Sequence, residues 1–238
     1  MPKYCLPLLL TICLCLLLLG FQGQISAQEP STVRIVVLGD SITKGVRTGV
    51  AAEEIYQHLL QTNLSMKEKP VVVLNEGIGG ERTDQAFKRL QKSVIDRKPH
   101  LVTIMYGTND SYVDPGKTES RISANEYGAN LESLVKQLQA EDIQVVLMTE
   151  PRWGQKARNG LGESPNDRLE LFMEECRKVA EKLEVPLVDN YVYWQQAEAD
   201  GANLSDWTTD ECHPNAAGHE QITKAMLPVL KPLVAEIN

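Results

Sequence analysis

Ser41 is the first candidate for chemistry, because it stands directly after an apolar run, 33–38, with the composition of a buried strand. A serine in that place would lie at the carboxyl edge of a sheet, where a nucleophile can meet a substrate. Near the other end of the chain, Asp210 precedes His213 by three residues, so its carboxylate could meet one imidazole nitrogen in a tight loop. Each segment alone also fits a plainer role, as a helix cap for Ser41 and as a structural histidine for His213.

Two further segments contain groups that could stabilise negative charge. Residues 75–83 hold three glycines in four positions, which let the backbone approach a ligand closely or simply make a tight turn. Asn109 follows another apolar run, 101–105, and could aim its amide at a developing oxyanion or belong to an ordinary polar turn. The glycine segment is not a dinucleotide-binding fingerprint, because the third glycine of GxGxxG would fall at Arg82.

Other kinds of chemistry find less support. Cys212 is a rival nucleophile, but nothing nearby in the sequence lowers its pKa, so Ser41 is preferred. The phosphate-binding pattern GxxxxGK[ST] is missing, and the histidines form neither HExxH nor a close ligand cluster. We therefore expect no phosphate-binding loop and no metal site.

The elements that must position these residues alternate along the chain. Short apolar runs rich in Val and Ile predict five buried strands, and the stretches between them have helical spacing. This alternation predicts an α/β fold in which helices cover both faces of a parallel sheet. Pro228 and Pro232 are expected to interrupt the last helix after Leu227. The predicted strands are 33–38, 71–74, 101–105, 143–148 and 185–188, and the predicted helices are 51–64, 83–95, 124–138, 168–183 and 216–227.

Composition and the first residues indicate where the protein works. With 24 basic and 32 acidic residues the formal net charge is −8, which argues against a nucleic-acid partner. Lys3, the apolar run 6–19 and the small residue Ala27 are typical of a secretory signal peptide over residues 1–27, leaving a domain over 28–238. A membrane anchor is the alternative, but the run is shorter than the ~20 residues of a spanning helix. We expect export to the periplasm or the extracellular space, with no stable membrane insertion after cleavage.

Taken together, the segments resemble the four blocks of the SGNH hydrolases, also called GDSL esterases or lipases. The matching segments are Gly39-Asp40-Ser41, the glycine loop that ends at Gly80, Gly107-Thr108-Asn109-Asp110, and Asp210-Glu211-Cys212-His213-Pro214. Ile42 replaces the leucine of the GDSL name, which is a conservative change. The resemblance covers nearly all of the expected mature domain. It implies a flavodoxin-like, three-layer α/β/α sandwich with a five-stranded parallel sheet in the order 2-1-3-4-5.

The resemblance also implies a serine esterase that needs no cofactor. Ser41 would be the nucleophile, His213 the base and Asp210 its partner. The oxyanion hole would combine the N–H groups of Ser41 and Gly80 with the side chain of Asn109. The expected substrate is a small-molecule or glycan ester, with short-chain or carbohydrate O-acetyl esters preferred. A lysophospholipase or thioesterase type of lipid acylhydrolase and a catalytically silent binding module are the alternatives.

Two further residues are candidates for substrate contact. Asp40 stands beside the nucleophile, and Trp153 lies in the irregular segment 151–165 after the fourth predicted strand. An ordinary packing role is an equally plain interpretation of Trp153. Two points stay open at this stage, the oligomeric state and whether Cys176 and Cys212 form a disulfide in an exported chain.

Overall fold

The computed structural model describes Met1 and residues 32–237, so the expected signal peptide lies, apart from Met1, outside the described residues. Five strands form one sheet in the order β2-β1-β3-β4-β5, and every neighbouring pair is parallel. This confirms the predicted fold class and strand order. The strands are β1 (Val33–Gly39), β2 (Val71–Gly77), β3 (Leu101–Met105), β4 (Gln144–Met148) and β5 (Leu187–Val188).

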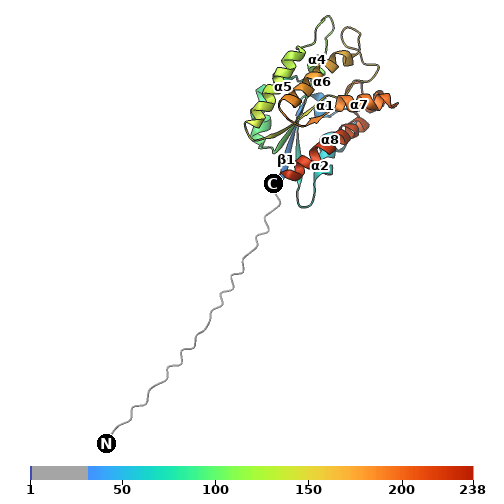
Figure 1. The fold of residues 1–238 in the computed structure, drawn as a ribbon. Helices are drawn as coiled ribbons and strands as arrows, with labels where there is room; N and C mark the ends of the chain where they lie inside the picture. Colours follow the sequence, from blue (N-terminus) through green and yellow to red (C-terminus); the bar gives the residue numbers. More distant parts are fainter. Residues whose placement is uncertain (2–31, 238) are drawn as a thin grey trace.

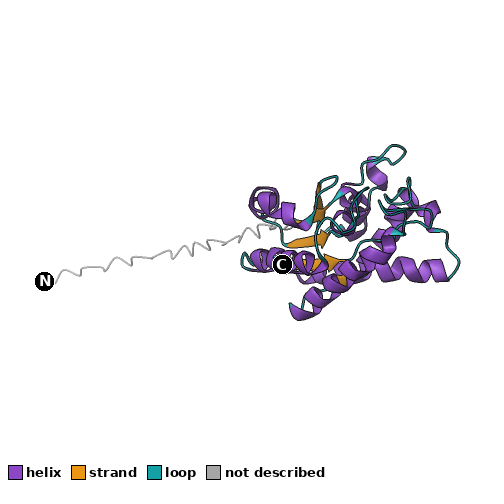
Figure 2. Ribbon diagram, turned by 90° about the horizontal axis from the view of Figure 1, so that it is seen from above, coloured by secondary structure: helices purple, strands orange, loops and turns teal. Residues whose placement is uncertain are grey.

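Helices cover both faces of the sheet and complete a three-layer sandwich (Figures 1 and 2). On one face lie α3 (Thr83–Arg89), the π-turn η2 (Leu90–Val94), α5 (Ala124–Gln139) and α6 (Pro165–Lys182). On the other lie α2 (Tyr56–Leu64), α7 (Asn190–Ala199) and α8 (Ala216–Glu236). The short elements are α1 (Ser41–Lys44), η1 (Ala52–Glu54), η3 (Ile95–Arg97), α4 (Thr108–Ser111) and η4 (Leu204–Trp207).

The continuous apolar run in β1 follows from its place inside the sheet. Successive side chains of a strand point to opposite faces, and helices cover both faces here. Val36 and Leu38 therefore enter the core under α3, α5 and α6, whereas Ile35 and Val37 enter the core under α2 and α8. All four are fully buried. Such packing holds the carboxyl end of β1, where Ser41 follows, in a fixed place.

The prediction that Pro228 and Pro232 interrupt the last helix after Leu227 is wrong. α8 continues through both prolines to Glu236. The two rings are exposed on the outer side of the helix, so the lost N–H donors and the steric cost fall on the side facing water. On the inner side, an apolar residue recurs every four positions and packs into the core: Ile222, Met226, Leu230 and Val234. Packing of this stripe outweighs the local cost of the prolines.

Three further findings go beyond the sequence prediction. Helix α7 was not predicted, because its buried residues Tyr191 and Trp194 alternate with polar and exposed neighbours without a clear stripe. Cys176 and Cys212 are separate buried thiols, so they do not pair with each other. Within residues 32–237, no helix combines the length and the apolar character that a membrane span requires.

Candidate active site

Ser41, His213 and Asp210 form a continuous chain of contacts at the carboxyl edge of the sheet. Ser41 begins α1 and is separated from the end of β1 by Asp40 alone, and its Oγ lies 2.9 Å from His213 Nε2. The other ring nitrogen, Nδ1, lies 2.9 Å from Asp210 Oδ2. Because the carboxylate accepts at Nδ1, it selects the tautomer in which Nε2 can accept the serine proton. The arrangement can turn a hydroxyl into a nucleophile.

Hydrogen bonds within the loop that carries His213 stabilise its conformation. Asp210 Oδ1 accepts hydrogen bonds from the backbone N–H groups of Cys212 and His213, at 3.2 and 2.8 Å. A bridge between Thr208 and Pro214 closes the loop, and Asn215 caps the first turn of α8. The single carboxylate of Asp210 therefore shapes the loop and orients the imidazole at the same time.

The local environment favours the neutral form of His213. Burial lowers the pKa of His213 below its ordinary value, although contact with Asp210 partly offsets this, and the positive charge of Arg47 lowers it further. Partial burial opposes the ionisation of Asp210, but hydrogen bonds from His213 outweigh it and leave the pKa of Asp210 below its usual range. A neutral base beside an ionised carboxylate is the state that proton abstraction needs.

Asn109, on α4 after β3, is fixed in orientation by two charged neighbours. Its Nδ2 donates to Asp40 Oδ2 at 2.9 Å, and its Oδ1 accepts from Arg121 Nη1 at 3.1 Å. A carboxylate can only accept and a guanidinium can only donate, so the two contacts determine which end of the amide is nitrogen. The second N–H of the amide has no partner among residues 32–237 and is available to a bound oxyanion.

The glycine loop after β2 is tied to both neighbouring strands. The N–H of Ile78 donates to the carbonyl of Gly39 at 3.0 Å, which joins the loop to the end of β1. At the far end, Asp110 Oδ1 accepts from the N–H and the hydroxyl of Thr83, at 2.9 and 2.6 Å. Gly80 itself has φ of 77°, a backbone conformation that other residues adopt only with strain. These ties fix Gly80 relative to Ser41 and Asn109.

The predicted catalytic and oxyanion groups share one cleft of about 380 Å³, which we call the serine cleft. The backbone N–H of Ser41 lies in the first turn of a helix, where it has no intrahelical acceptor. The residues that line the serine cleft are Ser41, Lys44, Val46, Arg47, Gly79, Gly80, Asn109 and His213. The structure thus brings together Ser41, Gly80, Asn109 and His213, with Asp210 behind the imidazole.

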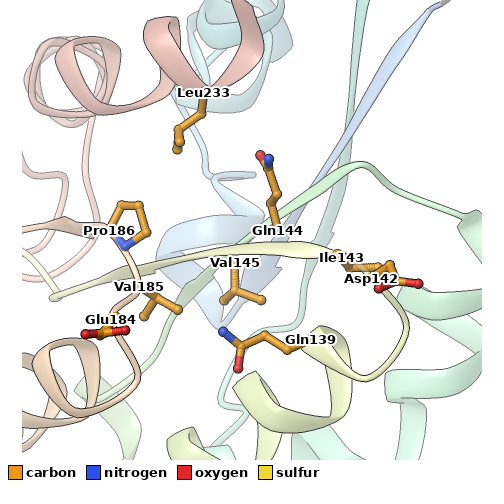
Figure 3. Close-up of a pocket in the computed structure, with 9 residues that line it drawn as sticks. All are labelled: Gln139, Asp142, Ile143, Gln144, Val145, Glu184, Val185, Pro186 and Leu233. Carbon is orange, nitrogen blue, oxygen red and sulfur yellow. The ribbon is translucent and has the colours of Figure 1, made fainter. Parts of the chain in front are cut away.

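A second cavity of about 390 Å³ is separate from this chemistry. It lies beside the amino-terminal end of β4, between the end of α5 and the segment before β5 (Figure 3). In a parallel sheet that end is the edge opposite to the one where Ser41 follows β1. Val145, Val185 and Pro186 form much of its wall, and none of the predicted site residues lines it. It is therefore not part of the candidate active site.

Asp40 does not fit the substrate contact that the sequence prediction gave it. Its side chain is fully buried, and it accepts from the N–H of Ile42 at 2.8 Å as well as from Asn109. Burial raises the pKa of Asp40 to about 7, partly offset by the bond from Ile42. Because it contacts the oxyanion-side amide and not the open cleft, Asp40 is a positioning residue.

A second buried carboxyl, Glu150, lies behind Asp40, two residues after the end of β4. Neither of its oxygens has a hydrogen-bond partner of good geometry among the described residues. Burial raises the pKa of Glu150 well above its ordinary value, and the nearby charges of Asp40 and Asp110 add to the shift. The N–H donors of Ile42 and Asn109 favour the ionised form of Asp40, so Glu150 is the member of the pair that stays protonated.

Trp153 also lies outside the serine cleft. Its ring is half-buried, packs against the core under α6 and stacks on Tyr112 with 5.9 Å between ring centroids. Its backbone N–H and carbonyl pair with the side chain of Asn166. The packing interpretation of Trp153 therefore fits the structure better than substrate contact. Cys212 is buried as well, and burial raises the pKa of its thiol well above the ordinary value, which disfavours it as a nucleophile.

Sequence reasoning missed four residues around the site. Glu150 carried the same signal as the others, a polar side chain directly after a predicted strand, and could have been found. Arg121 had no signal, because it reaches Asn109 from a segment twelve residues away. Lys44 and Arg47 follow Ser41 by three and six residues and line the serine cleft, but as single cations they had no signal in the sequence.

The comparisons with known proteins agree with this geometry. The model of the GDSL-like lipase/acylhydrolase family matches residues 37–221. An acetylxylan esterase of Geobacillus stearothermophilus is 30% identical over 67% of this chain and 72% of its own length. Esterase TesA of Pseudomonas aeruginosa is 26% identical over 95% of this chain and 98% of its own. A solved variant of an acetyl-xylooligosaccharide esterase from Geobacillus superposes with a TM-score of 0.70 and 25% identity, covering 82% and 93% of the two chains. Since the family model spans most of the chain, this protein belongs to the GDSL-like lipase/acylhydrolase family and is a carboxylic ester hydrolase.

Proposed function

We propose that the protein hydrolyses carboxylic esters through an acyl-enzyme on Ser41, with His213 as the base and Asp210 as its orienting partner. The observation that carries this proposal is the unbroken chain of contacts from Ser41 Oγ to His213 Nε2 and from Nδ1 to Asp210, at 2.9 Å each. Nucleophile, base and orienting carboxylate within hydrogen-bond distance are what covalent acyl transfer requires.

The steps follow from the chemistry of these groups. Ser41 Oγ attacks the ester carbonyl carbon while its proton passes to His213 Nε2, and the carbonyl oxygen becomes an oxyanion. The C–O bond to the alcohol then breaks, and His213 returns the proton to the departing alkoxide. A water molecule, deprotonated by the same histidine, attacks the acyl-enzyme, and the acid leaves as Ser41 regains its proton.

The oxyanion would be held by the N–H groups of Ser41 and Gly80 and by the free N–H of Asn109. Support comes from their common place in the serine cleft and from the ties that fix the glycine loop and the amide. Donors fixed before the reaction starts stabilise charge without reorganising during it.

Short acyl groups, including acetyl esters of carbohydrates, are the substrate class that fits best. Val46 is the only aliphatic side chain larger than alanine among the residues that line the serine cleft, so the cleft offers little apolar surface to a long acyl chain. The names of the acetylxylan esterase relatives point the same way. The lipid acylhydrolase alternative lacks a comparable observation in the described residues, and a silent binding module would have no use for an oriented triad.

We further propose that residues 1–27 direct export and that the domain over 28–238 works in the periplasm or outside the cell. The support is the sequence pattern around Lys3, residues 6–19 and Ala27. Expression of the full chain followed by amino-terminal sequencing of the exported protein tests this, and a retained Met1 on that protein would contradict it.

The test of the triad is covalent labelling combined with turnover. A serine-reactive phosphonate should label the native protein and should fail to label Ser41→Ala, whose ester hydrolysis should fall by several orders of magnitude. Ser133→Ala on α5 is the matched control and should keep both labelling and turnover. Retained turnover in a clean, folded Ser41→Ala preparation would refute the assignment.

A further inference from the structure

The serine cleft has a charge opposite to that of the protein as a whole. The chain carries 32 acidic and 24 basic residues, a net charge of −8. The charged side chains that line the serine cleft are nevertheless Lys44 and Arg47, and no carboxylate lines it. Two cations in one cleft create a local potential that attracts negatively charged ligands.

Neither cation is committed to another group. Lys44 is the exposed last residue of α1, and no described carboxylate lies within ion-pair distance of it. Arg47 Nη2 lies 3.8 Å from Asp210 Oδ2, at the limit of an ion pair, and makes no hydrogen bond among residues 32–237. Asp210 is meanwhile occupied by the ring and backbone of His213. The guanidinium donors of Arg47 are therefore available to a ligand.

The place of Arg47 indicates which half of an ester would carry the negative charge. His213 returns its proton to the departing alkoxide, so the alcohol half must lie against the imidazole. Arg47 lines the serine cleft and lies beside Asp210, so it is at the imidazole end of the cleft, where the alcohol departs. The oxyanion donors Gly80 and Asn109 contact the carbonyl instead. A negative charge on the alcohol half would therefore lie toward Arg47, and Lys44 adds a second positive charge to the same cleft.

We infer that the natural substrate is an ester whose alcohol half bears a carboxylate or a phosphate, held by Arg47 and Lys44. This inference rests on the proposed ester hydrolysis at Ser41 and narrows its substrate class. A guanidinium binds either oxyanion with two parallel N–H bonds, and the ammonium of Lys44 adds a point charge that follows the anion. Neutral sugar or alkyl alcohols would leave both cations without a partner.

The experiment compares acetyl esters that share one acyl group and one ring and differ in charge. Meta-acetoxybenzoate and meta-acetoxyphenyl phosphate are the two anionic substrates, and meta-acetoxybenzamide is the neutral one. We expect kcat/KM to favour at least one anionic ester over the neutral one by roughly tenfold, as a pair of close charges near a protein surface would give. The better of the two anions distinguishes a carboxylate from a phosphate.

The ratio of anionic to neutral kcat/KM should fall about three- to tenfold in Lys44→Gln and in Arg47→Gln, and further in the double variant. Added salt should lower the same ratio in the native protein, because ions screen exposed charges. Lys67→Gln is the matched control. It removes one positive charge from an exposed loop before β2, at the opposite edge of the sheet, and should leave the ratio unchanged.

The outcomes separate this inference from the proposed function. If the native protein hydrolyses all three esters with equal kcat/KM, the esterase assignment stands and the inference is wrong. A preference for anions that survives in the double variant would also overturn it, because the charge would then be bound elsewhere. If no ester is hydrolysed and Ser41 resists phosphonate labelling, the proposed function fails and the inference fails with it.

Discussion

The side-chain amide of Asn109 donates to the fully buried carboxylate of Asp40, with 2.9 Å between Nδ2 and Oδ2. Asp40 immediately precedes Ser41, so one carboxylate links the proposed nucleophile to the residue that we propose holds the oxyanion. Arg121 contacts the other end of the same amide at 3.1 Å. The contact defines the orientation of the amide before any substrate binds.

Replacing Asn109 with alanine should lower kcat by ~10²–10³, the typical effect of losing one oxyanion donor. KM should change little, because the amide binds the ground-state carbonyl much more weakly than the oxyanion. Steady-state kinetics and a thermal midpoint measured on the same preparation check this. Asn63→Ala, in an exposed part of α2, is the control with the same substitution. A protein that melts several degrees lower and keeps kcat within a few-fold would make Asn109 a turn residue.

The fall of kcat/KM at acid pH should follow the protonation of His213. Burial lowers its pKa despite the contact with Asp210, so kcat/KM should fall with an apparent pKa below ~6.5, the unperturbed histidine value. Arg47→Gln removes a nearby positive charge that disfavours the imidazolium, so it should move this fall to higher pH. Hydrolysis of a neutral ester measured against circular dichroism at each pH checks both points. A rate that stays flat down to about pH 5 would argue against His213 as the base.

Glu150→Gln should change how stability depends on pH. Burial raises the pKa of Glu150 in the folded protein well above the value of an unfolded glutamate. The stability that this proton contributes is therefore complete below the unfolded pKa and is lost as pH rises toward the folded one, by up to about 1.4 kcal/mol per pH unit. Glutamine does not titrate, so its stability does not depend on this proton. The thermal midpoint of Glu150→Gln should therefore rise relative to that of the native protein as pH increases.

Glu170→Gln, an exposed position on α6, is the control for this substitution. Its melting curve should run parallel to that of the native protein between about pH 5 and 8. Parallel curves for Glu150→Gln as well would mean that Glu150 has the same protonation in the folded and unfolded chain, contrary to the structure.

The mostly polar lining of the serine cleft predicts a preference for short acyl groups. Within a series of esters of one alcohol, kcat/KM should be highest for acetyl and should decline toward decanoyl, because the lining residues give a long chain little apolar contact. Val46→Ala removes the one aliphatic side chain in the lining and should lower the rate on medium chains more than on acetyl. A large preference for decanoyl would refute the short-acyl assignment and favour the lipid acylhydrolase alternative.

Local sequence patterns were enough to predict the layers and most of the site. A strand buried on both faces must be continuously apolar, so β1, β3 and β4 were visible as runs of Val, Ile, Leu and Met. Parallel strands place their carboxyl ends at one edge, so Ser41 and Asn109 had to lie near each other. Asp210 and His213 are three residues apart, and their contact is a local one.

The tertiary structure decided what depends on contacts between distant segments. α8 passes through Pro228 and Pro232 because its inner stripe packs against the core, and no local rule measures that packing. Asp40 is not available for substrate contact, because the fold buries its side chain, which accepts a hydrogen bond from Asn109 instead. Burial depends on the whole fold and could not be read from the local sequence. The positive lining of the serine cleft is likewise a property of how the chain folds back, since Lys44 and Arg47 are ordinary surface cations in the sequence and face His213 only once α1 and the loop before α8 are brought together.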